Sequence, residues 1–490
     1  MRDVIGYEEK DPAITAHLTS GYPRFVVHPL LQRAAVVLQR TQAGLAGREI
    51  WLCAGPAVAA ALHAHLDGVG EVVSVTPYLT AYAFPSAVSL ADDVAAALSR
   101  RTKHFLQHTG GFASSRAAED WLAARREIEA VVPVPNEAAA KAASEQVCGA
   151  MAGFFGAGLT ADAVCLTPSG MAATYAAFQA VNAVQAPRGR TRWVQLGWLY
   201  LDTIAILQKF TATPADDYLH HADVFDLTGL GKLFVAHAGQ IAGVLAEVPT
   251  NPLIQTPSLP ALLALCRAHG VALVVDPTIA STLNVDVLPH ADVVVNSLTK
   301  YTAGEGDVIL GAAAVNPASP LAAELRPALV AAAALAPVYP RDLVRLAEQI
   351  GATPSLVARI NENTPRVVEF LRAHPRVAEV FWSGHVASAA NYAALARTPG
   401  SVGSMITFTL RPSLALPAFY DRVRIAKGPS FGLSTSLICP FMYLAHYDLV
   451  TTEEGRAELR RNGLNPDLLR LSVGAEPAEE IIAALAEALD

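Results

Sequence analysis

The chain has 490 residues, of which 52% are apolar and 16% charged, and its formal net charge is −8 at pH 7. This composition suits a large folded protein of two or three domains and excludes a disordered or fibrous chain. An acidic balance without a long Lys/Arg cluster provides no surface for nucleic acid or an anionic membrane, so small-molecule partners are expected.

Cysteine usage and the N-terminus favour a cytoplasmic protein. The five cysteines are scattered and form neither a C-x-x-C pair nor a disulfide framework, so free thiols are expected. The first residues, MRDVIGYEEKDPAITAHL, carry acids where a secretory signal would carry an apolar core, and no targeting peptide is predicted. The longest Ala/Leu/Val run, residues 328–338, is too short to span a bilayer.

Residues 1–135 are predicted to form an N-terminal extension with a small α/β appendage. A turn at GYPRF precedes an apolar-periodic helix, and EIWLCAG, a helix over 56–66 and EVVSVTP then form a β-α-β-like stretch. No G-x-G-x-x-G follows the first strand, and the GLGK at 229–232 is not a Walker loop.

No metal site is predicted from the histidine pairs. His63 and His65 are two positions apart on a predicted helix and therefore diverge, while His220 and His221 are adjacent in a predicted loop. Neither pair is supported by an H-E-x-x-H motif or a Cys/His cluster.

Residues 136–340 alternate Ala-rich helices with short apolar strands and are predicted to form one large domain. The predicted strands are AVCLTP, RWVQLG, IAGVLAEVP, GVALVVDP, ADVVVNS and VILGAAAVN. Continuous apolar strands between helices indicate a parallel sheet that is buried on both faces. Such a sheet binds its ligand at the C-terminal ends of the strands.

Residues 341–490 are predicted to form a separate C-terminal α+β domain. Helices are expected to about residue 374, followed by the strands VAEVFW, SMITFTL, RVRIAKG and LLRLSVG, and a closing amphipathic helix in PAEEIIAALAEAL.

Two strand ends carry the residues with the clearest chemistry. ADVVVNSLTKYTAGEGDV places Lys300 just past a buried strand, beside Ser297 and Thr299. A lysine in an apolar setting loses its charge readily and becomes a usable amine, while the hydroxyls can bind a phosphate. GVALVVDPTIAS delivers Asp276, followed by Thr278, and a carboxylate there can pair with a protonated ring nitrogen. Taken alone, Lys300 could instead be a solvated surface lysine, and Asp276 could instead cap a helix.

A third strand end leads into a helix N-terminus. AVCLTP runs into SGMAATYAAFQAV, which places Ser169, Gly170 and Met171 at the start of a helix. Free backbone N–H groups and the helix dipole make a phosphate cradle there, with ordinary capping as the alternative.

These segments, in this order, resemble the Cys/Met-metabolism PLP (pyridoxal 5′-phosphate) enzymes, the family of cystathionine γ-synthase, from about residue 136 to the C-terminus. NSLTKYTAGEGDV matches the family pattern of Ser-x-Thr-Lys-Tyr, a glycine-rich turn and Asp-Val. The resemblance implies PLP-dependent transferase fold type I (aspartate aminotransferase-like), an α/β fold. Its large domain has a mostly parallel seven-stranded sheet, and a C-terminal α+β domain follows. It also implies bound PLP, amino-acid substrates, and a homodimer or homotetramer.

The resemblance also implies roles for single residues. Lys300 carries the cofactor and moves protons, and Tyr200 of WLYLDT stacks on its ring. Arg470 of LLRLSVGAE binds the substrate α-carboxylate. AEVPTNPLIQ supplies Glu247 and Asn251. The implied cofactor-binding residues are Lys300, Asp276, Thr278, Ser297, Thr299, Ser169, Gly170, Met171, Tyr200, Asn251 and Arg116. The implied substrate-binding residues are Arg470, Ser430, Asn251 and Thr435.

Some positions depart from the family pattern. Members carry a Tyr-Ser-Arg stretch whose side chains reach the phosphate of the neighbouring subunit, and here GFASSRAAEDW supplies Arg116, 53 positions before Ser169. The N-terminal extension looks like that of a divergent, fungal-type cystathionine γ-synthase branch. Leu201 and Asp202 replace the glycines after the stacking tyrosine, and Thr435 stands where many members have glutamate.

The implied reaction is γ-replacement. An activated homoserine, O-acyl or O-phospho, reacts with a thiol such as cysteine and gives cystathionine or a related thioether amino acid. A cystathionine or methionine γ- or β-lyase, or a homoserine sulfhydrylase, is the alternative. A catalytically silent PLP-fold regulatory protein is the third.

Overall fold

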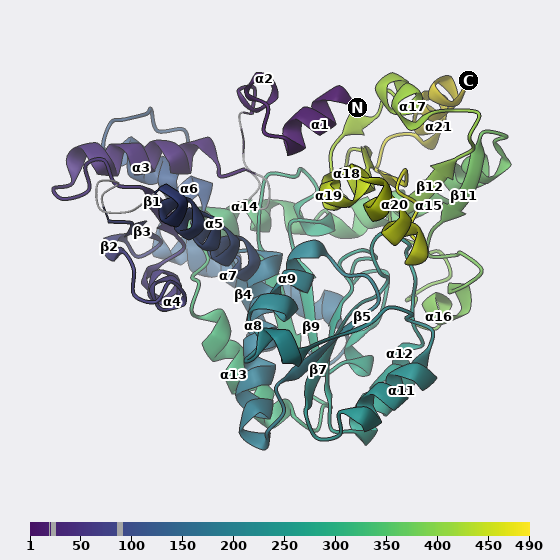
Figure 1. Cartoon of the computed structure of the whole chain (residues 1–490), viewed down its shortest axis with the longest axis horizontal. Coiled ribbons are helices and arrows are strands. Elements are labelled where there is room, and N and C mark those ends of the chain that lie inside the picture. The colour runs from purple at the N-terminus through teal and green to yellow at the C-terminus, as the bar shows by residue number, and fades with distance from the viewer. Residues whose placement is uncertain (19, 21–25, 86–91) are drawn as a thin grey trace.

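The computed structural model describes residues 1–18, 20, 26–85 and 92–490, and over these residues it contains sheets of three, seven and five strands (Figure 1). The small sheet lies in the N-terminal extension, the large sheet in the middle of the chain and the five-stranded sheet near the C-terminus. The turn predicted at residues 21–25 lies outside the described residues.

The small sheet has the order β1-β3-β2, and its middle strand is antiparallel to both neighbours. The predicted strands β1 and β2 therefore run parallel, but they do not pair with each other. All five residues of the inserted strand, LTAYA, are buried, but it was missed because Thr80 interrupts its apolar run and the run lacks polar alternation. The elements are α1 (Arg2–Glu8), α2 (Pro12–Thr15), α3 (Pro29–Thr41), β1 (Ile50–Cys53), α4 (Pro56–His65), β2 (Glu71–Thr76), β3 (Leu79–Ala83), α5 (Asp92–Thr109) and α6 (Ser115–Ala124).

The large sheet confirms the predicted α/β fold class. Its order is β4-β10-β9-β8-β7-β5-β6, and all neighbouring strands are parallel except β10, which is antiparallel to β9 and β4. Its strands are β4 (Val164–Thr167), β5 (Arg192–Leu196), β6 (Tyr218–His221), β7 (Ile241–Glu247), β8 (Ala272–Asp276), β9 (Val293–Ser297) and β10 (Gly311–Val315).

The loop predicted for His220 and His221 is wrong, because both residues belong to strand β6 and pair with β5. This strand lies at the end of the sheet order, and none of its residues is fully buried. An edge strand of this kind does not show the continuous apolar run by which the inner strands are recognised.

Helices cover both faces of the large sheet, as predicted. The packing of buried side chains places α8, α9 and α13 on one face and α7, α11, α12 and α14 on the other. The helices of this part are α7 (Glu137–Phe155), α8 (Gly170–Gln185), α9 (Leu201–Lys209), α10 (Pro214–Asp217), α11 (Leu227–Ala236), α12 (Leu259–Ala268), α13 (Ala322–Ala333) and α14 (Pro340–Ile350), with short 3-10 turns η2 (Ala161–Ala163), η3 (Ala186–Arg188), η4 (Leu288–His290) and η5 (Tyr301–Ala303).

The C-terminal sheet has the order β11-β12-β15-β14-β13. The predicted strand RVRIAKG shrinks to the two residues of β13, and β14 was missed because Pro440 ends its short apolar run. The elements are α15 (Thr353–Ala373), β11 (Val377–Phe381), α16 (Ala389–Ala393), β12 (Met405–Leu410), α17 (Leu416–Arg422), β13 (Ala426–Lys427), β14 (Leu437–Pro440), α18 (Phe441–Ala445), α19 (Tyr447–Val450), α20 (Glu453–Arg461), β15 (Leu469–Ser472) and α21 (Ala478–Leu489).

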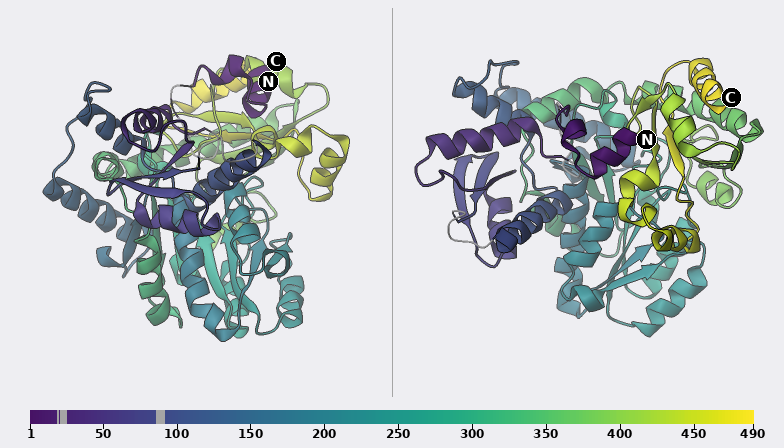
Figure 2. Two further views of the ribbon diagram at one scale, coloured as in Figure 1. Left: turned by 60° about the vertical axis from the view of Figure 1, so that its left-hand side comes forward. Right: turned by 45° about the horizontal axis from the view of Figure 1, so that its top comes forward.

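The first helix lies beside the C-terminal domain, away from the small sheet (Figure 2). The N-terminal amine pairs with Asp421, and Tyr447 Oη donates a hydrogen bond of 2.7 Å to Glu9 Oε1. Both ends of the chain therefore contact one domain. Across the described part of the chain, no helix combines the length and apolarity needed to cross a membrane.

Candidate active site

Lys300 lies at the junction of the large sheet and the C-terminal domain. It follows β9 and caps the short turn η5, and only 8% of its surface is exposed. Its Nζ donates a hydrogen bond of 2.8 Å to Ser430 Oγ and lies 5.0 Å from the ring centroid of Phe431. Burial, together with the positive charge of Arg470, lowers the pKa of Lys300 to about 7. A substantial share of this amine is neutral near pH 7 and able to attack a carbonyl carbon.

Asp276 and Glu247 end two adjacent strands and face each other in the sheet register. Asp276 Oδ1 accepts hydrogen bonds from both the backbone N–H and the hydroxyl of Thr278. Withdrawal from solvent raises the pKa of Asp276 to about 6, against the opposing effect of these two bonds. Burial and the nearby Asp276 charge raise the pKa of Glu247 well above its usual range.

This pair of carboxyl groups suits a cationic ligand. A protonated ring nitrogen against Asp276 would supply the opposite charge and lower the pKa of that carboxyl group. Thr278 links Asp276 to the end of β9, since its Oγ1 also accepts a 2.9 Å hydrogen bond from Ser297 N. Asp276, Thr278 and Ser297 are thus brought together as predicted.

The start of α8 packs directly on Ser297. Ser169 caps the helix, and its Oγ accepts a 3.0 Å hydrogen bond from Ala172 N. A Cβ added at Gly170 would lie 2.7 Å from Ser297 Cβ and 2.9 Å from Ser297 Oγ, so only glycine allows this approach. The first N–H groups of a helix, here those of Gly170 and Met171, have no intrahelical acceptor and suit a phosphate.

Two further predicted cofactor contacts are Tyr200 and Thr299. Tyr200 caps α9, and its backbone N donates to Glu247 Oε1, which places it at the end of β7. Thr299 is buried, and its hydroxyl makes a long hydrogen bond of 3.5 Å to Leu310 O.

Arg470 lies on β15 with 4% of its surface exposed. Its Nη1 donates a 3.2 Å hydrogen bond to Asn251 Oδ1, and its Nη2 donates to Pro429 O. Its guanidinium carbon lies 5.5 Å from the Phe431 ring centroid and 4.8 Å from that of Phe441.

Arg470, the predicted carboxylate ligand, and Lys300, the predicted cofactor lysine, therefore contact the same aromatic ring, that of Phe431. The two phenylalanines were missed, although Phe431 directly follows the predicted Ser430.

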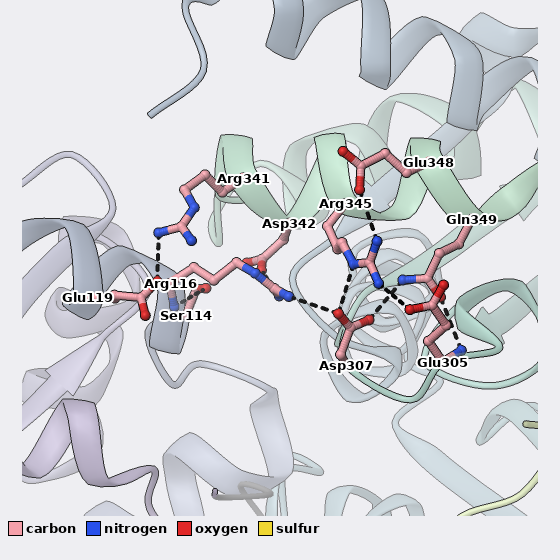
Figure 3. A network of polar contacts seen from close by, with 10 residues as sticks. All are labelled: Ser114, Arg116, Glu119, Glu305, Asp307, Arg341, Asp342, Arg345, Glu348 and Gln349. Atoms are coloured by element: carbon pink, nitrogen blue, oxygen red, sulfur yellow. Dashed lines mark hydrogen bonds and ion pairs between the residues drawn. The ribbon is translucent and has the colours of Figure 1, made fainter. Parts of the chain in front are cut away.

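Two predicted residues do not lie in this group of contacts. Thr435 is exposed. Arg116 donates a 2.9 Å hydrogen bond to Asp342, and its other nitrogen lies 3.4 Å from Asp307 (Figure 3). Asp307 also accepts hydrogen bonds from Arg345 and Gln349 of α14. In this chain Arg116 therefore joins α6 to α14 and to the loop after Lys300.

Within the described residues, no group of three or more His, Cys, Asp or Glu side chains could hold a metal ion. The groups that do converge fit PLP: a buried amine for its aldehyde, a carboxylate for its ring nitrogen and a helix start for its phosphate.

Comparisons with known proteins agree with this geometry. The model of the Cys/Met metabolism PLP-dependent enzyme family matches residues 157–490. An L-2-amino-4-chloropent-4-enoate dechlorinase/desaturase of Streptantibioticus cattleyicolor is 40% identical, covering 100% of this chain and 94% of its own. A cystathionine gamma-synthase of Neurospora crassa is 32% identical over 68% of this chain and 52% of its own.

Solved structures show the same relationship. The cystathionine gamma synthase of Xanthomonas oryzae pv. oryzae, in complex with cystathionine, matches with a TM-score of 0.59 and 26% identity, over 74% of this chain and 89% of its own. The match to the family model extends over more than half of the chain and includes both Lys300 and Arg470. The chain therefore belongs to the Cys/Met metabolism family of PLP-dependent enzymes.

Proposed function

We propose that this enzyme removes a leaving group from the γ-carbon of an L-α-amino acid. The substrate to test first is L-2-amino-4-chloropent-4-enoate, from which chloride would leave. The observation that carries the proposal is the 40% identical relative of that name, which aligns with the whole chain, including residues 1–135. The Neurospora cystathionine gamma-synthase covers only 68% of the chain.

The chemistry of that substrate agrees with the family's site. The chlorine is on C4, which is the γ-carbon of the amino acid and the position of the leaving group in γ-replacement. The C4–Cl bond breaks and chloride leaves with the bonding electrons, one C–H proton is lost, and the product gains one degree of unsaturation. No oxidant or reductant is needed.

The chain's own residues supply the steps around this bond cleavage. Arg470, held by Asn251, binds the α-carboxylate with its planar fork. Lys300, with its pKa lowered to about 7, accepts and returns a proton at Cα. When bound, PLP would withdraw electrons from Cα, and Asp276 would keep its ring nitrogen protonated. Phe431 and Phe441 cover the guanidinium and exclude water from it.

γ-Replacement of an O-acyl- or O-phosphohomoserine by a thiol is the second candidate. It is favoured by the cystathionine gamma-synthases among the relatives and structures. It shares the departure of the γ-substituent and differs in the final step, where a thiol such as cysteine adds to the γ-carbon.

Product analysis distinguishes the candidates. PLP-loaded protein is incubated separately with L-2-amino-4-chloropent-4-enoate, O-acetylhomoserine and O-succinylhomoserine, each with and without cysteine, and chloride and amino acids are measured. Chloride release with a product lighter by HCl supports the elimination. Cystathionine formed only with cysteine supports replacement, and 2-oxobutanoate with ammonia indicates a γ-lyase. No turnover of any substrate by PLP-loaded protein would contradict both candidates and favour the silent regulatory alternative.

A further inference from the structure

We infer that the turn formed by residues 107–110 of the N-terminal extension, at the end of α5 and including the glycine after it, forms part of the cofactor site and positions the starts of both α8 and α9. The inference rests on the proposed site, in which α8 holds the phosphate and Tyr200 at the start of α9 stacks on the ring. It assigns the extension a direct role in cofactor binding.

The first contact is between Gly110 and the cap of α8. Gly110 has φ +69°, a conformation that L side chains rarely adopt. A Cβ at this position would lie 2.3 Å from Ser169 Oγ and 2.5 Å from Ala172 N, the two atoms that make the capping hydrogen bond. The Gly110 backbone therefore packs on the predicted phosphate cradle, and any larger residue would displace its cap.

The second contact is with Asp202, two residues after Tyr200. Asp202 is 1% exposed, and its Oδ1 accepts a 2.7 Å hydrogen bond from Gln107 Nε2. His108 Nδ1 lies 3.2 Å from the same oxygen. A buried carboxylate needs a hydrogen-bond donor, and Gln107 of the extension supplies one.

The same turn also reaches the other end of α9. The opposite nitrogen of the His108 ring, Nε2, lies 3.1 Å from Lys209 Nζ at the last residue of the helix. His108 is 4% exposed, so it is enclosed between the extension and the large domain. The start of α9 is also held by the hydrogen bond that Tyr200 N donates to Glu247 Oε1. The orientation of Tyr200 therefore depends on both β7 and α5.

A pair of glycine substitutions tests the first contact. Gly110→Ala and Gly189→Ala both force alanine into a positive φ, +69° and +76°, but a Cβ at Gly189 meets no atom within 4 Å. The PLP dissociation constant of each apo variant is measured by equilibrium dialysis. We expect it to rise at least about tenfold in Gly110→Ala and to stay near the wild-type value in Gly189→Ala. Equal dissociation constants in two folded variants would overturn the role of Gly110.

Gln107→Met provides a second test, because it removes the bond to Asp202 with little change in side-chain size. We expect weaker PLP binding and an altered visible circular dichroism of the bound cofactor, since Tyr200 would shift against its ring. A wild-type dissociation constant together with a wild-type dichroism spectrum in this variant would overturn the inference even if Gly110→Ala failed to fold.

One control separates this inference from the proposed site. Wild-type protein loaded with PLP is reduced with borohydride and digested, and the labelled peptide is identified by mass spectrometry. Label on Lys300 supports the proposed site, so that a wild-type result for both variants overturns only the role of the α5 turn. Label absent from Lys300 would overturn the site and the inference together.

Discussion

Lys300 Nζ donates a hydrogen bond of 2.8 Å to Ser430 Oγ, and this bond connects the large sheet to the C-terminal domain. Phe431, the next residue, contacts both Lys300 and Arg470. The amine proposed to bond the cofactor and the guanidinium proposed to bind the substrate are thus held by one short segment. A displacement of that segment would change both functions at once.

Replacing Lys300 by alanine is expected to abolish turnover. General acid–base catalysis alone accounts for about 10²–10⁴-fold in rate, and the covalent attachment of the cofactor is lost as well. Chloride release and cystathionine formation are measured with PLP added in excess. Lys300→Arg serves as the control that keeps the positive charge without a usable amine, and it should be equally inactive. Turnover by either variant at the wild-type rate would rule out the proposed role.

The rate at which apo protein takes up PLP should rise with pH around a midpoint near 7, the pKa of Lys300. Below the midpoint the amine is protonated and cannot attack the aldehyde; above it the amine is neutral. Stopped-flow absorbance measures this rate. An ordinary lysine would give a midpoint near 10.4, and such a value would contradict the buried environment described for this residue.

Two substitutions should move that midpoint in opposite directions. Arg470→Met removes a positive charge that lowers the pKa of Lys300, so the midpoint should move to higher pH. Ser430→Ala removes a hydrogen-bond acceptor that favours the protonated amine, so the midpoint should move to lower pH. Shifts of the same sign in both variants would show that one of these contacts does not control the amine.

Asp276→Asn should lower kcat/KM by about 10²–10⁴-fold. It would remove the carboxylate proposed to pair with the protonated ring nitrogen of PLP, and loss of one partner of a buried ion pair costs about 3–5 kcal/mol. Asp292→Asn is a matched control. Asp292 is a buried carboxylate directly before β9, but its partners are Leu273 N and Ser319 Oγ. The control should lower thermal stability and leave the visible spectrum of bound PLP unchanged. Identical spectra and rates for the two variants would argue against Asp276 as the ring-nitrogen partner.

Arg116→Met tests whether this residue holds the fold or binds phosphate. It leaves Asp342, which is 6% exposed, without its guanidinium partner, and we expect a loss of about 3–5 kcal/mol in unfolding free energy. Adding Asp342→Asn should recover part of that loss. Two quantities are measured for each variant: the unfolding free energy, from denaturant titration, and the PLP dissociation constant. Unchanged stability with weakened PLP binding would instead support the phosphate contact that the family resemblance implies.

Local features of the sequence were sufficient to predict the fold class and the family. The apolar runs that end at Asp276 and Ser297 form inner parallel strands, because a strand buried on both faces must be apolar throughout. The residues at their ends meet because parallel strands bring their C-terminal ends to one side of the sheet. Strand β6 contains two histidines, and Thr80 interrupts the buried run of β3, so neither strand shows a continuous apolar pattern and both were missed.

Tertiary structure decided which distant residues touch. Lys300 and Ser430 are 130 positions apart, and Gln107 and Asp202 are 95 positions apart. The network around Arg116 and the packing of Gly110 on Ser169 also join segments that are far apart in the sequence. The spacing of apolar residues in the sequence predicts only which face of its own helix or strand a side chain occupies, because that spacing follows local backbone geometry. Which partner covers that face depends on how whole elements pack, and so the contacts of residues 1–135 with the large domain could be seen only in the folded chain.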